Sequence, residues 1–455
     1  MNKKIFFTFI TTISTILLIF NPIAYSEDNQ NEEKTFFKVD KINDRWFFID
    51  PDGKPFFSVG IGSISATSGY SPELGYSEYY KNIMDLYGSE QNWANITHER
   101  IVDWGFNTLG GSGKYIRVKG LNYTINLGLA NDDWITGEIA DYFSNEWINY
   151  VDKRCKDKII NVSNDTKLIG YFLDNEIKWG SDWRGLLDIF DTYMKLEYYE
   201  AGKIRLVDFL KVKYQNNISK FNIVWRENFL DFDEILYEKT LGTWPYTIDA
   251  RNDHNDFLYI VAEQFYKVCY EKIKKYDSNH LILGSRFLSY FAPIKVLEAS
   301  KEYVDVISVN HYTPNPLIIP FWFIFQDIIG FARPTNYLKE FNKITDKPIL
   351  ISEFYFRALD SGLPNTKPYR FFMTVQFTQK QRAICFELQT RPFIKKPYSV
   401  GYHWFGYCDQ PKTGRFDGEN SNNGLVNIYD EPYEKLIKSI KQVNILAQNS
   451  VKNIK

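Results

Sequence analysis

The chain has 455 residues, which is long enough for one large barrel with insertions or for two domains. Its formal net charge of −2 argues against a nucleic-acid partner, because no basic stripe is present to neutralise phosphates. Its five histidines show no HExxH or HxH spacing and its four cysteines form no CxxC pair, so we expect no catalytic metal. Aromatic residues make up 17% of the chain, which indicates either a large aromatic core or flat surfaces on which sugar rings stack.

The N-terminus has the pattern of a secretory signal peptide. Two lysines precede the apolar run "IFFTFITTISTILLIF", and small residues follow at Ala24 and Ser26. We therefore expect a signal peptide over residues 1–26, cleaved after Ser26, and a disordered polar leader over residues 27–34. A retained membrane anchor is the alternative, although the run is short for a spanning helix. Cleavage would give a secreted or periplasmic protein with no stable membrane insertion.

A strand-then-helix alternation continues over residues 35–455. The segment "RWFFIDPDGKPFFSVGIGS" predicts a hairpin that turns at Asp52 and Gly53 and leads into a buried strand ending near Gly62. Further strands are expected in "FNTLGGS", "TINLGLA", "KLIGYFLDNE", "HLILGSRF", "VDVISVNHY", "KPILISEF" and "YSVGYHWFGY". Eight such strands with intervening helices predict an α/β fold, a (β/α)8 TIM barrel, whose functional residues lie at the carboxyl ends of the strands.

The spacing of the strands predicts one barrel with a large helical insertion after the fourth strand. The separation of Glu176 from Glu353 exceeds the roughly one hundred residues that three strand-helix units need. Most of the excess falls at about residues 181–256, a helical segment that would shape the binding site or serve only as packing. The tail "YEKLIKSIKQVNILAQN" has helical periodicity and predicts the last outer helix.

Two predicted strands end in a carboxylate, which is costly inside a sheet unless the acid faces a polar cavity or a partner. Asn175 and Glu176 close the fourth strand, and Glu353 closes the seventh. In a barrel these ends face one another across the mouth. Paired carboxylates on opposite sides of a cleft are what glycoside hydrolysis needs. Taken alone, each glutamate is equally compatible with a salt bridge or a helix cap.

The segments "YFLDNEIKWG" and "KPILISEFYFRALDSG" resemble the acid/base and nucleophile motifs of the β-agarase family within the clan-A retaining glycoside hydrolases. The segments "PDGKPFFSVG", "GFNTLG" and "YCDQPKTGRFDGENSNNGLV" resemble other parts of that family's catalytic barrel. The resemblance runs from about Arg45 to about Tyr433. It does not include the extra N-terminal sugar-binding module of many agarases, and "FRALDSG" has Arg357 and Ser361 where the family more usually shows Gly and Arg.

The resemblance implies that Glu176 is the general acid/base and Glu353 the nucleophile. Glu353 must stay ionised, so it needs hydrogen-bond donors, of which Tyr312 is the natural candidate. Glu176 must hold a proton near neutral pH, so it needs an apolar wall and the growing charge of its partner. Asn175 would donate to the sugar's 2-hydroxyl, or would simply cap the strand end.

Weaker candidates for substrate binding lie at strand ends and in the loops expected at the mouth. Trp404 would form the floor of the subsite for the cleaved sugar, as an aromatic residue commonly does in clan A, or would belong to the core. His311 would bind a hydroxyl, orient Tyr312 or merely be satisfied by hydrogen bonds. Asp174 would hold Asn175 or reach the substrate. The rim candidates are Trp179, Asp409, Gln410, Arg415 and Asn420.

The sequence and the resemblance thus predict an exported retaining glycoside hydrolase that cleaves β-glycosidic linkages, in particular β-galactosidic ones, of an oligo- or polysaccharide without a cofactor. Two alternatives stay open. A non-catalytic carbohydrate-binding barrel would keep the aromatic residues but would not need both carboxylates. A hydrolase or transglycosylase of the same fold with another sugar specificity would differ only in rim residues.

Overall fold

The computed structural model describes residues 35–111, 120–242, 246–288, 291–313, 337–366 and 375–452. The predicted signal peptide and leader lie outside these ranges and remain predictions. The described residues belong to one compact unit that begins at Thr35. Within these ranges, no helix is both long and apolar enough to cross a membrane.

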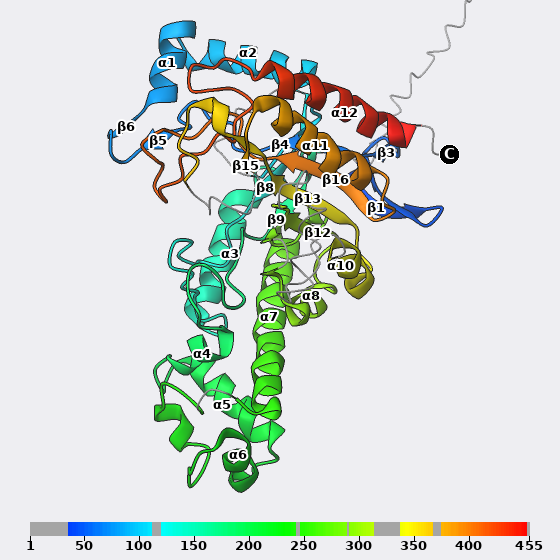
Figure 1. Cartoon of the computed structure of the whole chain (residues 1–455). Helices are drawn as coiled ribbons and strands as arrows, with labels where there is room; N and C mark the ends of the chain where they lie inside the picture. Colours follow the sequence, from blue (N-terminus) through cyan, green and yellow to red (C-terminus); the bar gives the residue numbers. More distant parts are fainter. Residues whose placement is uncertain are drawn as a thin grey trace, which may run out of the picture. The chain divides into compact units, whose positions relative to one another are not determined.

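A nine-stranded sheet lies at the centre of this unit, and every neighbouring pair of its strands is parallel (Figure 1). This confirms the predicted α/β architecture with a parallel sheet. In sheet order the strands are β10 (Leu281–Ile282), β9 (Leu168–Phe172), β8 (Asn122–Asn126), β7 (Thr108–Leu109), β4 (Ser58–Ile61), β16 (Ser399–Trp404), β13 (Ile349–Phe354), β12 (Ile307–Asn310) and β11 (Phe287–Leu288).

The long strands of this sheet are buried on both faces. All residues of β9 and β13 are buried, as expected for continuous apolar runs in a parallel sheet. Along β9, Ile169 belongs to a smaller core cluster and Leu168 and Tyr171 to a larger one, so the two faces of the sheet contact separate cores. The smaller cluster also takes Leu350 of β13 and Val400 of β16, which places residues from distant strands against one another.

The two strands at the ends of the sheet order are consecutive in the chain. On one side of the segment that joins them, the Leu283 amide donates to Tyr171 and the Leu173 amide donates to Gly284, at 2.7 and 2.8 Å. On the other side, the Arg286 amide donates to the Ser308 hydroxyl at 2.9 Å. The segment of β10 and β11 therefore hydrogen-bonds to both the β9 side and the β12 side, and the sheet is curled as in a TIM-like barrel.

Helices follow most of the strands. Ser144 caps the helix after β8 by accepting from the Trp147 amide, and Thr378 forms a capping box with Gln381 at the helix before β16. The last helix confirms the predicted helical tail. The helices are α1 (Glu78–Tyr87), α2 (Glu90–Asp103), α3 (Asn145–Ile159), α7 (Ile248–Tyr276), α8 (Ile294–Ser300), α10 (Tyr337–Thr345), α11 (Gln379–Ile394) and α12 (Glu434–Lys452).

Between β9 and α7 the chain forms four further short helices, α4 (Ile189–Met194), α5 (Ala201–Lys213), α6 (Ile218–Trp225) and the 3-10 helix η1 (Glu234–Tyr237). Helices α4, α5 and α6 pack against α7, which Figure 1 shows in green. An example of this packing is the Trp225 indole N–H, which donates to Asp253 of α7 at 2.8 Å.

The predicted hairpin is present at the start of the unit. Strand β2 (Arg45–Ile49) pairs antiparallel with β3 (Pro55–Phe56), and the turn between them contains Asp52 and Gly53, where Gly53 has φ 78°. A strand that the sequence analysis missed, β1 (Lys38–Ile42), pairs with the other edge of β2. Two small sheets, β5 (Tyr70–Ser71) with β6 (Tyr76–Ser77) and β14 (Arg357–Ala358) with β15 (Val375–Gln376), complete the strands.

Candidate active site

The two glutamates lie at the carboxyl ends of the strands that the sequence predicted. Glu353 lies within β13, and Glu176 follows β9 by four residues. Their side chains are buried, with residue exposures of 7% and 6%. The chain turns sharply at Glu176, which has a left-handed backbone with φ 55°. Two acids of like charge are therefore held in water-poor surroundings, where each needs hydrogen-bond partners.

One amide group joins the two carboxylates. The side-chain nitrogen of Asn310, at the end of β12, lies 2.8 Å from Oε1 of Glu176 and 3.5 Å from Oε2 of Glu353. The same nitrogen lies 3.0 Å from Oδ1 of Asn175. Ser352 fixes the amide by donating to its oxygen at 2.8 Å. Glu176 and Glu353 are therefore immediate neighbours across the end of the sheet.

Glu353 has a positive partner and a hydroxyl donor. Arg286, in the segment between β10 and β11, is 2% exposed and donates to Oε2 of Glu353. The Tyr312 hydroxyl donates to Oε1, so the predicted contact between Tyr312 and Glu353 is present. Burial and the Glu353 charge raise the pKa of Tyr312 well above its ordinary value, which keeps the hydroxyl protonated as a donor. Glu353 is therefore held by one cationic donor and one hydroxyl donor, each on a different carboxylate oxygen.

The surroundings of Glu176 favour its protonated form. Burial, followed by the negative charge of Glu353, raises the pKa of Glu176 to about 7. The hydrogen bond from Asn310 and the charges of Arg286 and Arg184 oppose this increase without cancelling it. Glu176 therefore holds a proton near neutral pH, as a general acid must, and it lies beside a second carboxyl group that has a cationic partner.

Asp174 positions the backbone around this pair. Its two carboxylate oxygens accept from the amides of Ala130, at 2.5 Å, and of Asn175, at 2.7 Å. Burial raises its pKa. Asp174 therefore contacts the backbone of Asn175, and its role in holding Asn175 or reaching the substrate stays a prediction. The Asn175 side chain is half-buried and contacts Asn310.

Three aromatic candidates are packed side chains. Trp179 is 3% exposed and its ring stacks on Tyr266 with centroids 6.2 Å apart. Trp404 is 1% exposed, and its indole N–H donates to the Asn423 carbonyl at 3.0 Å. His311 hydrogen-bonds through Nδ1 to the Tyr337 hydroxyl, and burial lowers the pKa of His311 to about 3, so the imidazole is neutral.

Two of the rim candidates fix the loop after β16. Asp409 accepts from the Asn422 amide group at 2.9 Å, from the Gly424 amide at 2.8 Å and from the Tyr433 hydroxyl at 2.5 Å. Burial raises the pKa of Asp409 to about 6. Gln410 accepts from the Ser421 amide at 2.7 Å. Both side chains are therefore engaged within the loop and its supports.

The other two rim candidates also have partners in this region. Arg415 forms ion pairs with Asp417 and Glu419 at 2.7 and 2.8 Å. Oδ1 of Asn420 accepts from the amide and the hydroxyl of Thr366, both at 2.8 Å. The Thr366 bonds join the loop of residues 405–433 to a neighbouring segment, and the exposed aromatic side chains of this loop include Phe416 and Tyr429, at 63% and 61%.

The sequence analysis missed Arg286 and Asn310. Both have a signal in the sequence, since a charged or amide side chain closes an otherwise apolar strand run in "HLILGSRF" and "VISVN". It also missed an aromatic rim, which consists of Trp134, Trp183 and Phe416. The ring of Trp134 lies edge-on to Trp183 and to Phe416, with centroids 6.4 and 6.3 Å apart, and so connects the loops that follow β8, β9 and β16.

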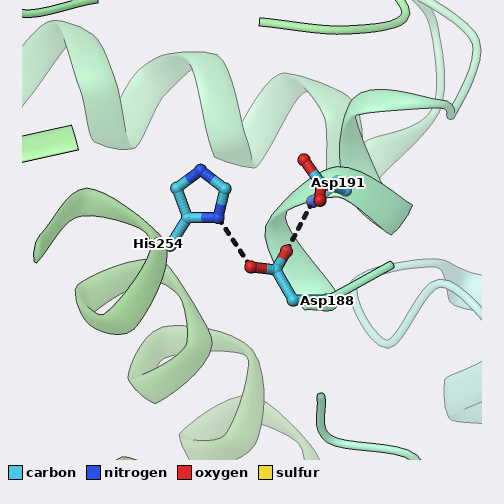
Figure 2. A group of neighbouring side chains, drawn as sticks. All are labelled: Asp188, Asp191 and His254. Carbon is cyan, nitrogen blue, oxygen red and sulfur yellow. Dashed lines mark hydrogen bonds and ion pairs between the residues drawn. The ribbon is translucent and has the colours of Figure 1, made fainter. Parts of the chain in front are cut away.

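Asp188, Asp191 and His254 are the described side chains that come close enough together to be considered for a metal ion (Figure 2). Asp188 caps α4 by accepting from the Asp191 amide at 3.0 Å, and its other oxygen lies 2.7 Å from Nδ1 of His254. The ring nitrogen that faces the acids is thus already engaged in a hydrogen bond. This group, named here the α4 cap group, is accounted for by helix capping.

No protein-family model matches the chain. In sequence it is 27% identical over 485 residues to Beta-agarase B of Vibrio sp. (strain JT0107), covering 90% of this chain and 48% of that protein. It is 26% identical over 464 residues to Beta-agarase A of the same strain, covering 88% of this chain and 44% of that protein. The chain therefore spans about half the length of the curated relatives that it matches.

Comparison with solved structures also finds agarases, in this case by their fold. An exo-beta-agarase superposes with a TM-score of 0.76 at 23% identity, covering 92% of this chain and 66% of that chain. The agarase AgWH50C superposes with a TM-score of 0.75 at 24% identity, covering 91% of this chain and 66% of that chain. BpGH50 superposes with a TM-score of 0.68 at 19% identity, covering 93% of this chain and 85% of that chain. The chain is therefore β-agarase-like in sequence over most of its length and has the fold of solved agarases.

Proposed function

We propose that the chain is a retaining glycoside hydrolase that cleaves β-galactosidic linkages of an agarose-like oligo- or polysaccharide. The observation that carries this proposal is the contact of one Asn310 nitrogen with the carboxylates of both Glu176 and Glu353, at 2.8 and 3.5 Å. The contacted oxygens can be no farther apart than the sum of these distances. Such closeness favours retention, because inverting enzymes hold their carboxyl groups roughly 6.5–9.5 Å apart.

In the first step, Glu353 attacks the anomeric carbon while Glu176 gives its proton to the glycosidic oxygen. The bond between the anomeric carbon and this oxygen breaks, and a covalent glycosyl-enzyme forms on Glu353. In the second step, Glu176 takes a proton from water, and the resulting oxygen nucleophile displaces Glu353. The donors Arg286 and Tyr312 stabilise the carboxylate before attack and as it leaves.

The proposed substrate rests on the curated relatives, which are named beta-agarases. The aromatic rim supports a carbohydrate, because Trp183 and Phe416 are 40% and 63% exposed and offer flat apolar faces to sugar rings. Asn175 is half-buried beside Glu176 and would donate to the sugar's 2-hydroxyl. We further propose that the curled sheet is a (β/α)8 barrel with a helical insertion at about residues 181–256, and that the protein is exported.

Glu353→Ala tests the mechanism. We expect it to abolish turnover of an activated aryl β-galactoside, and we expect azide to restore turnover by entering the vacated face, which gives a glycosyl azide of inverted configuration. The product is identified by NMR. Glu340→Ala, at an exposed glutamate of α10, is the matched control and should keep wild-type activity.

Two results would contradict the proposal. Rescue of Glu353→Ala that leaves the anomeric configuration unchanged would overturn the nucleophile assignment. A wild-type protein that binds agarose-derived oligosaccharides but cleaves no glycoside in a broad panel would instead favour the non-catalytic carbohydrate-binding barrel.

A further inference from the structure

Strand β13 has one extra residue, Ser352, directly before Glu353. In the pairing with β12, Ile351 and Glu353 lie opposite consecutive residues, the second of which is Asn310. Ser352 therefore has no partner in this pairing. In the pairing with β16, the register shifts over the same stretch, between Ile351 and Phe354. Both neighbours thus show the same irregularity, a β-bulge, which is rare between parallel strands and over-represented next to active sites.

The bulge turns two consecutive side chains toward one amide group. In a regular strand, neighbouring side chains point to opposite faces. Ile351 and Phe354 both belong to the larger core cluster, although residues three positions apart would face opposite ways without the bulge. Between them, the Ser352 hydroxyl donates to Oδ1 of Asn310 at 2.8 Å, and Oε2 of Glu353 lies 3.5 Å from Nδ2 of the same amide. The extra residue is what lets both side chains reach Asn310.

The two ends of the Asn310 amide have different partners. Its nitrogen faces three acceptor oxygens, at 3.0 Å in Asn175, 2.8 Å in Glu176 and 3.5 Å in Glu353. Its oxygen accepts from the Ser352 hydroxyl. Asn310 and Ser352 are 0% and 4% exposed, so bulk water does not replace this donor. The hydroxyl therefore supports the amide orientation in which the nitrogen donates to both acids.

The same orientation extends to Asn175. Because Oδ1 of Asn175 accepts from Asn310, the Asn175 nitrogen is turned away from Asn310. The Asn175 side chain is half-buried beside Glu176, where the proposed function places the sugar's 2-hydroxyl. The hydrogen bonds thus form a chain with one direction, from Ser352 to Asn310, from Asn310 to Asn175 and from Asn175 to the sugar. Bonds in such a chain polarise and strengthen one another.

We propose that Ser352 is a positioning residue, which through the amide of Asn310 turns the nitrogen of Asn175 toward the sugar's 2-hydroxyl. This inference rests on the proposed function, which supplies the sugar, and it adds a role for the bulge. Ser352 itself touches neither the sugar nor the reacting atoms. Without its hydroxyl, the amide of Asn310 turns its oxygen toward the proton of Glu176. Asn175 then turns as well and faces the sugar with its oxygen.

The test compares sugars with and without the 2-hydroxyl. Ser352→Ala removes the donor, and Ser352→Thr keeps it. For each variant, kcat/KM is measured with an aryl β-galactoside and with its 2-deoxy analogue, at a pH well below 7, where Glu176 is protonated. We expect Ser352→Ala to lower kcat/KM on the galactoside about tenfold, the typical effect of one lost hydrogen bond, and to change it little on the analogue. Ser352→Thr should restore the wild-type value.

The pH profile gives a second readout, which a merely structural serine would not move. The hydrogen bond from Asn310 lowers the pKa of Glu176, so a turned amide should raise that pKa above its present value of about 7. We therefore expect the loss of kcat/KM at high pH to begin at higher pH in Ser352→Ala and to stay in place in Ser352→Thr. Both variants keep the charged and titratable groups that face Glu176, which are Glu353 of β13, Arg286 before β11, Tyr312 after β12 and Arg184 in its own loop.

Ser300→Ala is the matched control, because the Ser300 hydroxyl is also buried and donates to the Leu297 carbonyl at 2.9 Å within α8. It should leave both kcat/KM values and the pH profile unchanged. An equal loss on both sugars in Ser352→Ala, or no loss on either, would overturn the positioning role. Thermal midpoints show whether the variants fold. If Ser352→Ala does not, Ser352→Cys, whose thiol is a weak donor, replaces it with the same expected pattern.

If the wild type cleaves neither galactoside, the proposed function has failed, and the amide is tested without turnover. Carbon-13 NMR of labelled glutamate side chains then follows the titration of Glu176, whose signal is identified by its loss in Glu176→Gln. A higher titration midpoint in Ser352→Ala than in the wild type supports the hold of Ser352 on Asn310, and equal midpoints overturn it.

Discussion

Two groups of buried or half-buried acids in this chain show opposite arrangements. At the ends of β9 and β13, burial and, after it, the repulsion from Glu353 raise the pKa of Glu176 to about 7. In the α4 cap group, the hydrogen bond and charge of His254 outweigh burial and lower the pKa of Asp188. A buried acid beside a second acid keeps its proton, whereas an acid paired with a histidine loses its proton more easily and caps a helix.

Loss of Glu176 should produce the largest effect and would establish that its proton is used. With Glu176→Ala we expect kcat/KM for an agarose-derived oligosaccharide to fall by about 10³, because a positioned general acid contributes 10²–10⁴-fold. Wild-type kcat/KM should fall as the pH rises through about 7, where Glu176 loses its proton.

Azide offers a second readout for the same variant. On an aryl β-galactoside it should yield a glycosyl azide of retained configuration, because Glu353 is still present and azide enters from the side of the missing base. If Glu176→Ala keeps the wild-type kcat/KM for the agarose-derived oligosaccharide at pH 7, the assignment of Glu176 as the acid is contradicted.

Tyr312→Phe should have a smaller effect in the same region. It removes the hydroxyl that donates to Oε1 of Glu353 and leaves the ring in contact with Tyr355. A hydrogen bond to a charged group is worth about 1.5–3 kcal/mol, so we expect kcat/KM to fall about 10- to 100-fold. Steady-state kinetics on the aryl galactoside measures this, and an unchanged rate would show that Arg286 alone is sufficient for Glu353.

The raised pKa of Glu176 also predicts a pH-dependent change in stability. A carboxyl group whose folded pKa is raised from 4.5 to about 7 stabilises the fold below about pH 4.5, and this contribution is lost as the pH rises through 7. Glu176→Gln stays neutral, so its stability relative to the wild type should increase by about 1 to 3 kcal/mol between pH 5 and pH 8. Urea unfolding at both pH values measures this, with Glu340→Gln as control. A difference that does not change with pH would contradict the prediction.

Changes in the α4 cap group should have the smallest effect and should not affect catalysis. Asp188→Ala removes the cap of α4 and the partner of His254. We expect a loss of about 1 to 2 kcal/mol, typical of a helix cap, seen as a lower thermal midpoint, with unchanged kcat/KM. A large loss of activity in Asp188→Ala would show that the α4 cap group also contributes to catalysis, and would contradict its assignment as a purely structural group.

The sequence predicted the features that follow from patterns of single strands. Apolar runs that end in Glu176 and Glu353 predicted that both carboxyl groups lie at strand ends, and "VNHY" predicted the contact of Tyr312 with Glu353. Asn310 and Arg286 were missed because their importance depends on which strands are neighbours. Arg286 reaches Glu353 because β12 lies between β11, which follows Arg286, and β13, which carries Glu353.

Rim residues were harder to predict than strand ends. Loop residues such as Asp409 and Arg415 are polar, which is equally compatible with sugar binding and with bonds within the loop, and the structure places them in such bonds. Trp183 and Phe416 are recognised as a rim only by their exposure and by their shared neighbour Trp134. Exposure depends on tertiary packing, which the residue pattern does not contain.

The left-handed backbone of Glu176 has a consequence for laboratory evolution. Several other residues with positive φ are asparagines, such as Asn131 and Asn365, and asparagine tolerates this conformation. A glutamate adopts it at a cost of about 1 kcal/mol or more. Glycine would relieve this strain and would also remove a buried acid. A library selected only for heat resistance should therefore become enriched in Glu176→Gly. The selected proteins would have higher thermal midpoints and no catalytic activity.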